Sequence, residues 1–493
     1  MTLVHRVLPP EPVLSLDEHV KRRGGRGLDV ARQVEPEALI DELEASGLRG
    51  RGGAGFPTHI KWRTVRANAS GSVPTTVVVN GAEGEPGTYK DRTILRLDPY
   101  SVLEGALIAA LAVGADHIVV GLKRSVADVV VRVRDAAAEM TSAGWTTGVT
   151  IDVFEGPDEY LYGEETALLE TIDGRDPFPR IAPPFRRGVD ETVTTAAELG
   201  SGSGQSGRVE MASADPTDPA APTLVDNVET LANVPRIIAR GGAWFRTDGS
   251  DQSPGTIVCT VTGSVQRGGV AEYVMGTPLR QVIEEISGGA RPGRSIVAVL
   301  GGVSNAFIPA SALDTPLTYE DMAAAGAGLG SAGFVVYDDR DDLVAVAAGA
   351  SRFLAVESCG QCTPCKQDGL ALSGLLERLA RSDAGARELG QIRDRVRTIG
   401  TGARCSLATQ HEVIVRSLLD RFPDQVEVHL SGSAERVTPA LVAELVSIDA
   451  EGDVVVDERH RDKQPDWTYD GTDSGQSPAD RLDEHRAERG LPE

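Results

Sequence analysis

Residues 357–366 read Glu-Ser-Cys-Gly-Gln-Cys-Thr-Pro-Cys-Lys, and they place Cys359, Cys362 and Cys365 at Cys-x2-Cys-x2-Cys spacing. A fourth cysteine, Cys405, follows later, and the whole chain contains only five cysteines. Three thiolates on one short loop with a single distant partner are typical of a 4Fe–4S cluster held by four cysteines. The spacing therefore predicts a cluster-binding region in this part of the chain.

Other uses of these cysteines fit less well. A structural zinc site usually has two Cys-x2-Cys pairs or a mixture of cysteine and histidine, whereas the triplet here has one distant partner. Zinc and redox thiols stay open as alternatives. Disulfides are not expected, because cysteine is sparse and the N-terminus lacks the layout of a secretory signal. The fifth cysteine, Cys259, lies in the apolar run 256–261, where we expect a buried side chain.

The region around the cysteines has a helical pattern. Leucines at helical spacing in 369–381 put the triplet at a helix N-terminus, which favours the negative charge of a thiolate-ligated cluster. Cys405 precedes a second helical run, 411–422. We therefore expect a helical domain over residues 337–425.

The bulk composition limits the classes of function. A chain of 493 residues is expected to form about two to four domains. Its net charge of −24 argues against a nucleic-acid partner and against an anionic membrane surface. Since no run of about 18 apolar residues occurs, we expect no direct membrane insertion. These features fit a cytoplasmic protein, or an acidic subunit that docks on another protein.

A glycine-rich loop follows the first clear helical pattern, residues 35–48. Residues 47–57 read Gly-Leu-Arg-Gly-Arg-Gly-Gly-Ala-Gly-Phe-Pro. A Rossmann glycine turn follows a strand and opens a helix, so this loop is of another kind. Its backbone can approach a ligand closely, and Arg49, Arg51 and Lys61 supply positive charge suited to phosphate groups. The alternative is a surface linker.

Strand and helix patterns alternate beyond this loop. Strands are expected at 75–79, 117–121 and 149–154, and helices at 100–113 and 125–140, the second capped by Ser125. This rhythm predicts an α/β fold with a parallel, doubly wound sheet. Such sheets bind ligands beyond the carboxyl ends of their strands, where the polar loops 80–92, 123–124 and 156–166 lie. General acid–base chemistry ranks below ligand binding, because the acidic residues there have no nucleophile or histidine beside them.

The chain changes character from about residue 251. We expect a strand at 256–261, a hairpin at 265–274, a helix at 279–286 and a strand at 295–300. Beyond residue 425 we expect a short strand and a helix at 438–446. Residues 462–493 are polar and charged, and we expect them to be disordered.

Several motifs together resemble a known family. The matching segments are 46–62, 83–95, 160–168, 179–185, 227–234, 358–366 and the region of Cys405, in family order. They are similar to the NADH-binding flavoprotein subunit of respiratory complex I, which is the F subunit of NADH-quinone oxidoreductase. They also resemble the diaphorase subunits of NAD-linked hydrogenases and formate dehydrogenases. The resemblance implies FMN, a 4Fe–4S cluster and NAD as cofactors, with hydride transfer from NADH to FMN and single electrons passed onward.

The resemblance also implies a domain organisation. A Rossmann-like FMN/NADH domain with N-terminal helices would occupy 1–250, and a small ubiquitin-like α+β (SLBB) domain would occupy 251–336. The helical 4Fe–4S domain would cover 337–425, followed by a partly disordered extension, 426–493. The implied partners are a 2Fe–2S thioredoxin-like subunit or a larger iron–sulfur subunit, through which the chain would lie peripherally on the cytoplasmic side of a membrane.

The resemblance assigns site residues as well. The carboxylates expected to be catalytic are Glu85, Glu164 and Glu165. The residues expected to bind FMN or NADH are Gly50, Arg51, Gly52, Gly53, Gly55, Phe56, Lys61, Asn80, Glu83, Tyr160, Gly163, Phe185, Asn227 and Thr230. The expected cluster ligands are Cys359, Cys362, Cys365 and Cys405.

Some positions depart from the family pattern. Ala82 stands where the family usually has a carboxylate, and Thr64 where an aromatic residue often stacks on adenine. Residues 186–221 form an enlarged loop rich in Gly, Ser, Ala and Pro. Two alternatives therefore accompany the interpretation as an NADH dehydrogenase: a diaphorase subunit of a formate dehydrogenase or hydrogenase, and an electron-transfer scaffold that has lost NADH oxidation.

Overall fold

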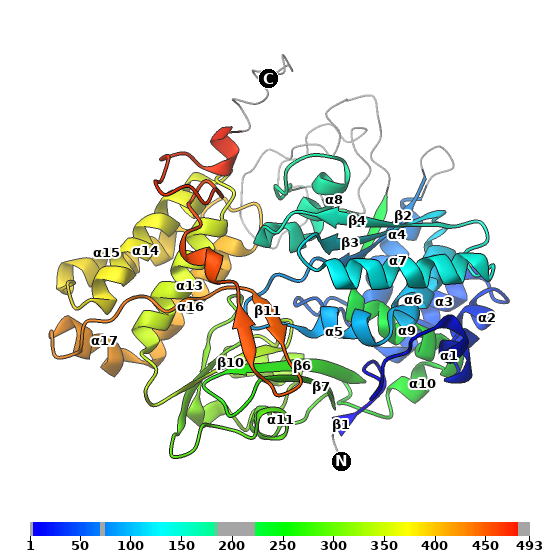
Figure 1. The fold of residues 1–493 in the computed structure, drawn as a ribbon, viewed down its shortest axis with the longest axis horizontal. Helices are drawn as coiled ribbons and strands as arrows, with labels where there is room; N and C mark the ends of the chain where they lie inside the picture. The colour runs from blue at the N-terminus through cyan, green and yellow to red at the C-terminus, as the bar shows by residue number, and fades with distance from the viewer. Residues whose placement is uncertain (1–2, 70–73, 182, 185–221, 482–493) are drawn as a thin grey trace.

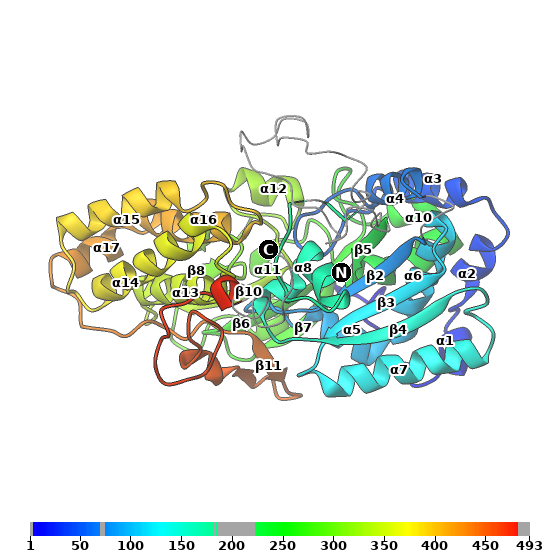
Figure 2. The same cartoon turned by 90° about the horizontal axis from the view of Figure 1, so that it is seen from above.

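The computed structural model describes residues 3–69, 74–181, 183–184 and 222–481 (Figure 1). Phe185 and the enlarged loop 186–221 lie outside these residues. The views in Figures 1 and 2 place a four-stranded sheet with its helices at one end and a helical region at the other, with a second sheet between them.

The first sheet is parallel, as the alternating pattern predicts. Its order is β4-β3-β2-β5, formed by β2 (Thr76–Gly81), β3 (His117–Lys123), β4 (Thr150–Gly156) and β5 (Thr223–Asn227). From β2 the chain proceeds outward to β3 and β4, and β5 then lies on the other side of β2. The strand order therefore reverses between β2 and β5, where open α/β sheets bind ligands.

Helices cover both faces of this sheet. The alternate side chains Val77 and Val79 of β2 belong to the core with α6 (Pro99–Val113), α7 (Ala127–Ser142) and α9 (Val228–Arg240). Val78 faces the opposite side, where a smaller core contains leucines of α8 (Glu165–Ile172). This alternation follows from the two-residue period of a strand. The doubly wound prediction is therefore confirmed.

The helices before and around the sheet differ in detail from the predictions. In the described part of the chain, four helices precede β2: α1 (Leu16–Lys21), α2 (Arg26–Ala31), α3 (Pro36–Ser46) and α4 (Thr58–Ala67). The short helices α5 (Lys90–Leu97) and α10 (Gly242–Phe245) complete this part of the chain. The prediction that Ser125 caps α7 is wrong: Val126 precedes the first turn, and the Ser125 N–H donates to Asp158 instead.

Gly47 explains where the glycine-rich loop begins. It ends α3 with φ +69°, a left-handed conformation that glycine adopts without steric strain. The loop thus connects the end of α3 with the start of α4.

The second sheet has the order β1-β7-β6-β10-β8-β9. Its strands are β1 (Leu3–Val4), β6 (Thr256–Gly263), β7 (Gly269–Val274), β8 (Ile296–Leu300), β9 (Phe307–Pro309) and β10 (Gly333–Asp338). Residues 265–274 are not a hairpin by themselves, because β7 is a single strand that pairs with β6. Cys259 is fully buried, as predicted, in the core that this sheet shares with α11 (Leu279–Ser287) and α12 (Tyr319–Ala324). The likeness to an SLBB domain stays a prediction.

Helices dominate residues 343–430, as predicted. They are α13 (Leu343–Glu357), α14 (Gly369–Ala380), α15 (Ala386–Thr398), α16 (Leu407–Arg421) and α17 (Pro423–Leu430). A π-helical turn, Pro364–Asp368, contains Cys365 and leads into α14. None of the helices in the described ranges is both long and apolar enough to cross a membrane.

The C-terminal extension contradicts two predictions. The expected helix at 438–446 is wrong: β11 (Leu445–Ile448) pairs instead with β12 (Val454–Val456), and its Val and Ile residues suit a strand. Disorder over 462–493 is wrong for residues 462–481, which pack on the helical region. Trp467 illustrates this packing, since its indole N–H donates to the carbonyl of Val356 at 3.0 Å. Residues 482–493 lie outside the described part of the chain.

Candidate functional site

A cavity of about 580 Å³ lies at the carboxyl ends of β2 and β5, where the strand order reverses. Its wall is formed by the glycine-rich loop, the segment after β2, and the 3₁₀ turn η1 (Tyr160–Gly163) with the start of α8. The start of α16 closes another side. The position agrees with the ligand cleft that the sequence predicts, but the loop 123–124 expected there is absent from the lining among the described residues.

Most of the expected site residues line this cavity. They are Gly50, Gly52, Gly53, Gly55, Phe56, Lys61, Asn80, Glu83, Glu85, Tyr160, Gly163, Glu164, Glu165, Asn227 and Thr230. Arg51 is absent from the lining among the described residues, and Phe185 lies outside them. Segments from distant parts of the chain therefore meet around one space.

The two arginines of the loop both contact Tyr319. The guanidinium of Arg51 is buried and donates to the Tyr319 hydroxyl and the Pro254 carbonyl, both at 3.1 Å. Arg49 stacks over the Tyr319 ring at 4.0 Å and donates to the carbonyl of Gly55 at 2.7 Å. Both side chains hold the loop against α12, which packs with the second sheet, and neither lines the cavity among the described residues. That they bring positive charge to a phosphate stays a prediction.

Lys61 provides a cation in the cavity wall. Its ammonium is paired with Glu165, and it donates to the carbonyl of Val225 at 2.6 Å. Asp226 lies behind it and accepts the indole N–H of Trp62 at 2.7 Å. Burial raises the pKa of Asp226 to about 6, although the charge of Lys61 opposes the rise. Burial would lower the pKa of Lys61, but the charges of Glu165 and Asp226 raise it above its usual value.

Glu85 is held by donors on both of its oxygens. The hydroxyl of Tyr160 donates to Oε2 at 2.6 Å, and the backbone N–H of Val303 donates to Oε1 at 2.7 Å. Burial nevertheless raises the pKa of Glu85, and burial together with the charge of Glu85 raises that of Tyr160. Tyr160 and Glu85 thus form a fixed pair in the wall.

Glu164 acts as a helix cap. Its side chain precedes α8 and accepts the backbone N–H groups of Thr166 and Ala167, both at 2.9 Å. Capping of this kind satisfies N–H groups that a helix leaves free in its first turn. Of the three carboxylates expected to be catalytic, Glu164 therefore has a clear structural task.

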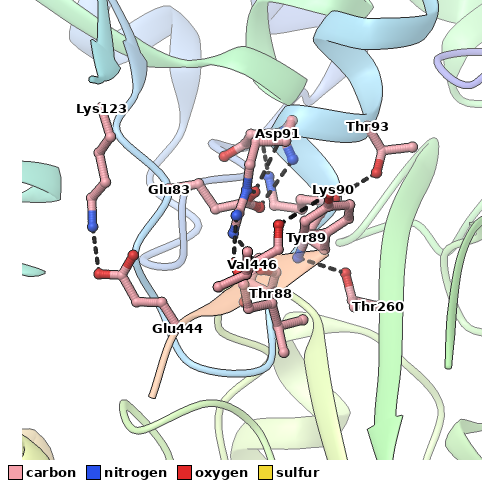
Figure 3. Close-up of polar contacts among 12 residues, drawn as sticks. Glu83, Thr88, Tyr89, Lys90, Asp91, Thr93, Lys123, Thr260, Glu444 and Val446 are labelled. Atoms are coloured by element: carbon pink, nitrogen blue, oxygen red, sulfur yellow. Dashed lines mark hydrogen bonds and ion pairs between the residues drawn. The ribbon is translucent and has the colours of Figure 1, made fainter. Parts of the chain in front are cut away.

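A second charged network behind the cavity was missed from the sequence. The ammonium of Lys90, which is fully buried, lies 2.7 Å from Asp91 and 3.0 Å from Glu229 (Figure 3 shows Lys90 beside Asp91). Asp91 lines the cavity and also accepts the side-chain N–H of Asn227 at 2.8 Å. The only sequence signal was the charged run 90–92 in a loop already expected to face the ligand.

The cavity wall has features that fit a flavin nucleotide. A side-chain carbon added at Gly52 would lie 3.2 Å from Asn227, so glycine keeps the backbone open toward this side of the cavity. The hydroxyl of Thr58 is buried in the wall and has no hydrogen-bond partner among the described residues. A polar ligand would supply the partner that a buried hydroxyl needs.

The four expected cluster cysteines come together beside this cavity. Cys359, Cys362, Cys365 and Cys405 line one small pocket. Within the described ranges, no three metal-binding side chains converge closely enough to hold a single metal ion. Four cysteines around one pocket fit a 4Fe–4S cluster, in which each cysteine binds a different iron. Burial raises the pKa of the Cys365 thiol to about 11, so thiolate ligation would require the compensating charge of a metal.

Comparisons with known proteins agree with this geometry. A family model described as the Nuo51 FMN-binding domain matches residues 43–236, and one described as the NADH-ubiquinone oxidoreductase-F iron-sulfur binding region matches 345–429. The NAD+-reducing [NiFe]-hydrogenase in its H2-reduced state has a similar structure, with a TM-score of 0.70 and 31% identity. That match covers 85% of this chain and 66% of the hydrogenase chain, just under two thirds of its length.

Curated relatives share most of their length with this chain. The F subunit of NADH-quinone oxidoreductase in Streptomyces coelicolor is 34% identical over 435 residues, covering 86% of this chain and 90% of the relative. The F subunit numbered 2 of the same enzyme in Rhizobium meliloti is 36% identical over 410 residues, covering 81% and 90%. On this identity and coverage, the chain belongs to the family of F subunits of NADH-quinone oxidoreductase.

Proposed function

We propose that this chain oxidises NADH at a bound FMN and passes the electrons singly to a 4Fe–4S cluster, as part of an NADH dehydrogenase module. One observation carries the proposal: Cys405 belongs both to the wall of the large cavity and to the pocket of the four cysteines. When bound, FMN accepts two electrons from NADH and can release them one at a time, as the cluster requires.

The side chains in the wall bind and orient in this proposal. Lys61, fixed by Glu165 and Asp226, supplies positive charge to an anionic part of the flavin or nucleotide. Glu85, fixed by Tyr160 in the cavity wall, would supply a carboxyl group to a bound ligand. The glycine-rich loop lets its backbone approach the ligands closely, and the remaining lining residues named above complete the binding site.

The assembly is also a proposal. We expect a separate 2Fe–2S thioredoxin-like subunit or a larger iron–sulfur subunit to accept the electrons, with the module peripheral on the cytoplasmic side of a membrane. The division into an FMN/NADH domain (1–250), an SLBB domain (251–336), a 4Fe–4S domain (337–425) and an extension (426–493) is consistent with the two sheets and the helical region.

The likeness to the NAD+-reducing hydrogenase favours a second candidate, the diaphorase subunit of a hydrogenase or formate dehydrogenase. The chemistry proposed for this chain is the same in both assemblies, so the partner alone distinguishes them.

An anaerobic titration of the purified chain with NADH tests the proposal. We expect bleaching of the flavin absorbance, followed by the EPR signal of a reduced cluster. In Cys405→Ser the flavin should still bleach while the cluster signal is lost, whereas Cys259→Ser, which alters a cysteine buried in another core, should behave as the wild type. Flavin and cluster that respond to dithionite but not to NADH would overturn NADH oxidation and leave an electron-transfer scaffold.

A further inference from the structure

The C-terminal extension contacts three parts of the molecule: the first sheet, the second sheet and the helical region. Glu444 forms an ion pair with Lys123 at the end of β3 (Figure 3), and the carbonyl of Gly452 accepts the N–H of Gly268 beside the second sheet at 2.7 Å. Further along, the Lys366 ammonium, next to Cys365, donates to the carbonyl of Pro465 at 2.6 Å. Residues 430–481 lie beyond the end of the matched iron–sulfur model at 429, yet they contact all three parts.

Two side chains of the extension converge on a buried carboxylate. Glu357, at the end of α13, is 2% exposed, and its Oε1 lies 2.7 Å from the Lys463 ammonium and 3.1 Å from His460 Nε2. A buried carboxylate is stable as an ion only when it is paired, and both of these partners come from the extension. The extension therefore supplies a cation that pairs with this buried carboxylate.

Glu357 connects the extension to the cavity. Its second oxygen, Oε2, accepts the backbone N–H of Tyr160 at 3.1 Å. Tyr160 begins the turn η1, and its hydroxyl donates to Glu85 in the cavity wall. Through Glu357, the position of the Lys463 ammonium is thus linked to a backbone atom of the wall.

Aromatic side chains form a second connection between the extension and Tyr160. The ring of His460 stacks on that of Phe353, with centroids 4.7 Å apart. Phe353 in turn meets the ring of Tyr160 edge-on, at 5.3 Å. The ionic contact through Glu357 and the aromatic contact through Phe353 both reach Tyr160. Two independent contacts on one residue indicate that the extension helps to fix its position.

We propose that Lys463 and His460 are positioning residues of the flavin cavity: they act through Glu357 and Phe353 to fix Tyr160 and the turn that forms one wall. The inference rests on the proposed function, because it takes the cavity to hold FMN. It assigns to the extension a role in the site itself rather than in partner binding.

The test compares FMN affinity in full-length variants. Lys463→Met leaves Glu357 buried with much of its compensating charge removed, which should shift the turn. A buried group that loses its partner costs the equivalent of about 10- to 100-fold in an equilibrium constant. We therefore expect the dissociation constant for FMN, measured by quenching of flavin fluorescence, to rise by about that factor. Arg459→Met is the matched control, since Arg459 lies on the same segment but forms an exposed ion pair with Asp457.

The double variant Glu357→Gln/Lys463→Met tests whether Lys463 acts on Tyr160 through Glu357. Glutamine retains an acceptor for the Tyr160 N–H and removes the uncompensated charge, so FMN affinity should return to within about threefold of the wild type. A lower melting temperature in Lys463→Met, with an FMN affinity equal to that of Arg459→Met, would reduce the extension to a structural support and overturn the proposal. A double variant as weak as Lys463→Met would overturn the route through Glu357.

These readouts do not depend on NADH. If the wild-type chain binds FMN but is not reduced by NADH, the proposed function fails while the comparison of FMN affinities still decides this inference. Dithionite-reduced EPR spectra of the same variants should keep the cluster signal, because the four cysteines are unchanged.

Discussion

Asp226 offers a quantitative test of the electrostatics in the cavity wall. Its native pKa is about 6, against 3.8 for the ordinary side chain, chiefly because it is buried. Each pKa unit corresponds to about 1.36 kcal/mol. Ionised Asp226 therefore lowers the free energy of unfolding by ~3 kcal/mol at neutral pH, in spite of Lys61 nearby.

The sign of the pH dependence follows from linkage. Because the native pKa is raised, the native state holds the proton more tightly than the unfolded chain, so the contribution of Asp226 to stability falls as the pH rises from about 4 through about 6. Asp226→Asn does not titrate and can still accept the indole N–H of Trp62. We expect the free energy of unfolding of the variant to increase relative to that of the wild type as the pH rises, by ~2 kcal/mol between about pH 4.5 and 7.5.

Urea unfolding of the two full-length chains, followed by tryptophan fluorescence, measures this difference. Titrating groups that do not interact with Asp226 contribute equally in both chains and cancel. Asp128→Asn is the control with the opposite sign, because its ion pair with Arg96 lowers the pKa of Asp128. That variant should lose stability relative to the wild type as the pH rises through the range where Asp128 ionises. A difference between Asp226→Asn and the wild type that is constant with pH would refute the reasoning.

Three further substitutions test neighbouring contacts. Glu165→Ala removes the ion-pair partner of Lys61 and should alter NADH turnover while the cluster EPR signal is kept; unchanged kinetics would exclude the proposed role. Glu164→Ala removes a helix cap and should lower the free energy of unfolding in urea by about 1 kcal/mol, and an unaffected midpoint would contradict the capping role. Lys90→Met leaves two buried carboxylates without their cation and should destabilise by about 3–5 kcal/mol, whereas Lys21→Met, in an exposed pair, should change stability by less than about 1 kcal/mol.

The sequence predicted those parts of the fold and site that depend on local pattern. The valines of β2 alternate between two cores, and the helical leucines after Cys365 occupy one face, so strand and helix periods were visible directly. The glycine-rich loop lines the cavity, and its composition predicts a backbone that can approach a ligand closely. Because Gly52 has no side chain, the backbone of the loop can lie close to Asn227.

The direction of the arginine side chains could not be predicted in the same way. Arg49 and Arg51 lie in a loop that faces a cavity, and charge alone suggested contact with a phosphate. Their orientation is decided by Tyr319, which is far along the chain and presents a ring face and a hydroxyl to them. A long-range partner of this kind leaves no trace in the local sequence.

The C-terminal extension shows why its composition wrongly predicted disorder for residues 462–481. A polar, charged segment is expected to stay disordered when it cannot bury enough apolar surface to offset its conformational entropy. Here complementary charge also holds the segment: Lys463 pairs with the buried carboxylate of Glu357, and Glu444 pairs with the buried ammonium of Lys123. A charged residue can therefore order a segment when its partner is already buried elsewhere. Composition measures the segment alone, and so it cannot reveal that Lys463 pairs with a buried carboxylate 106 residues earlier in the chain.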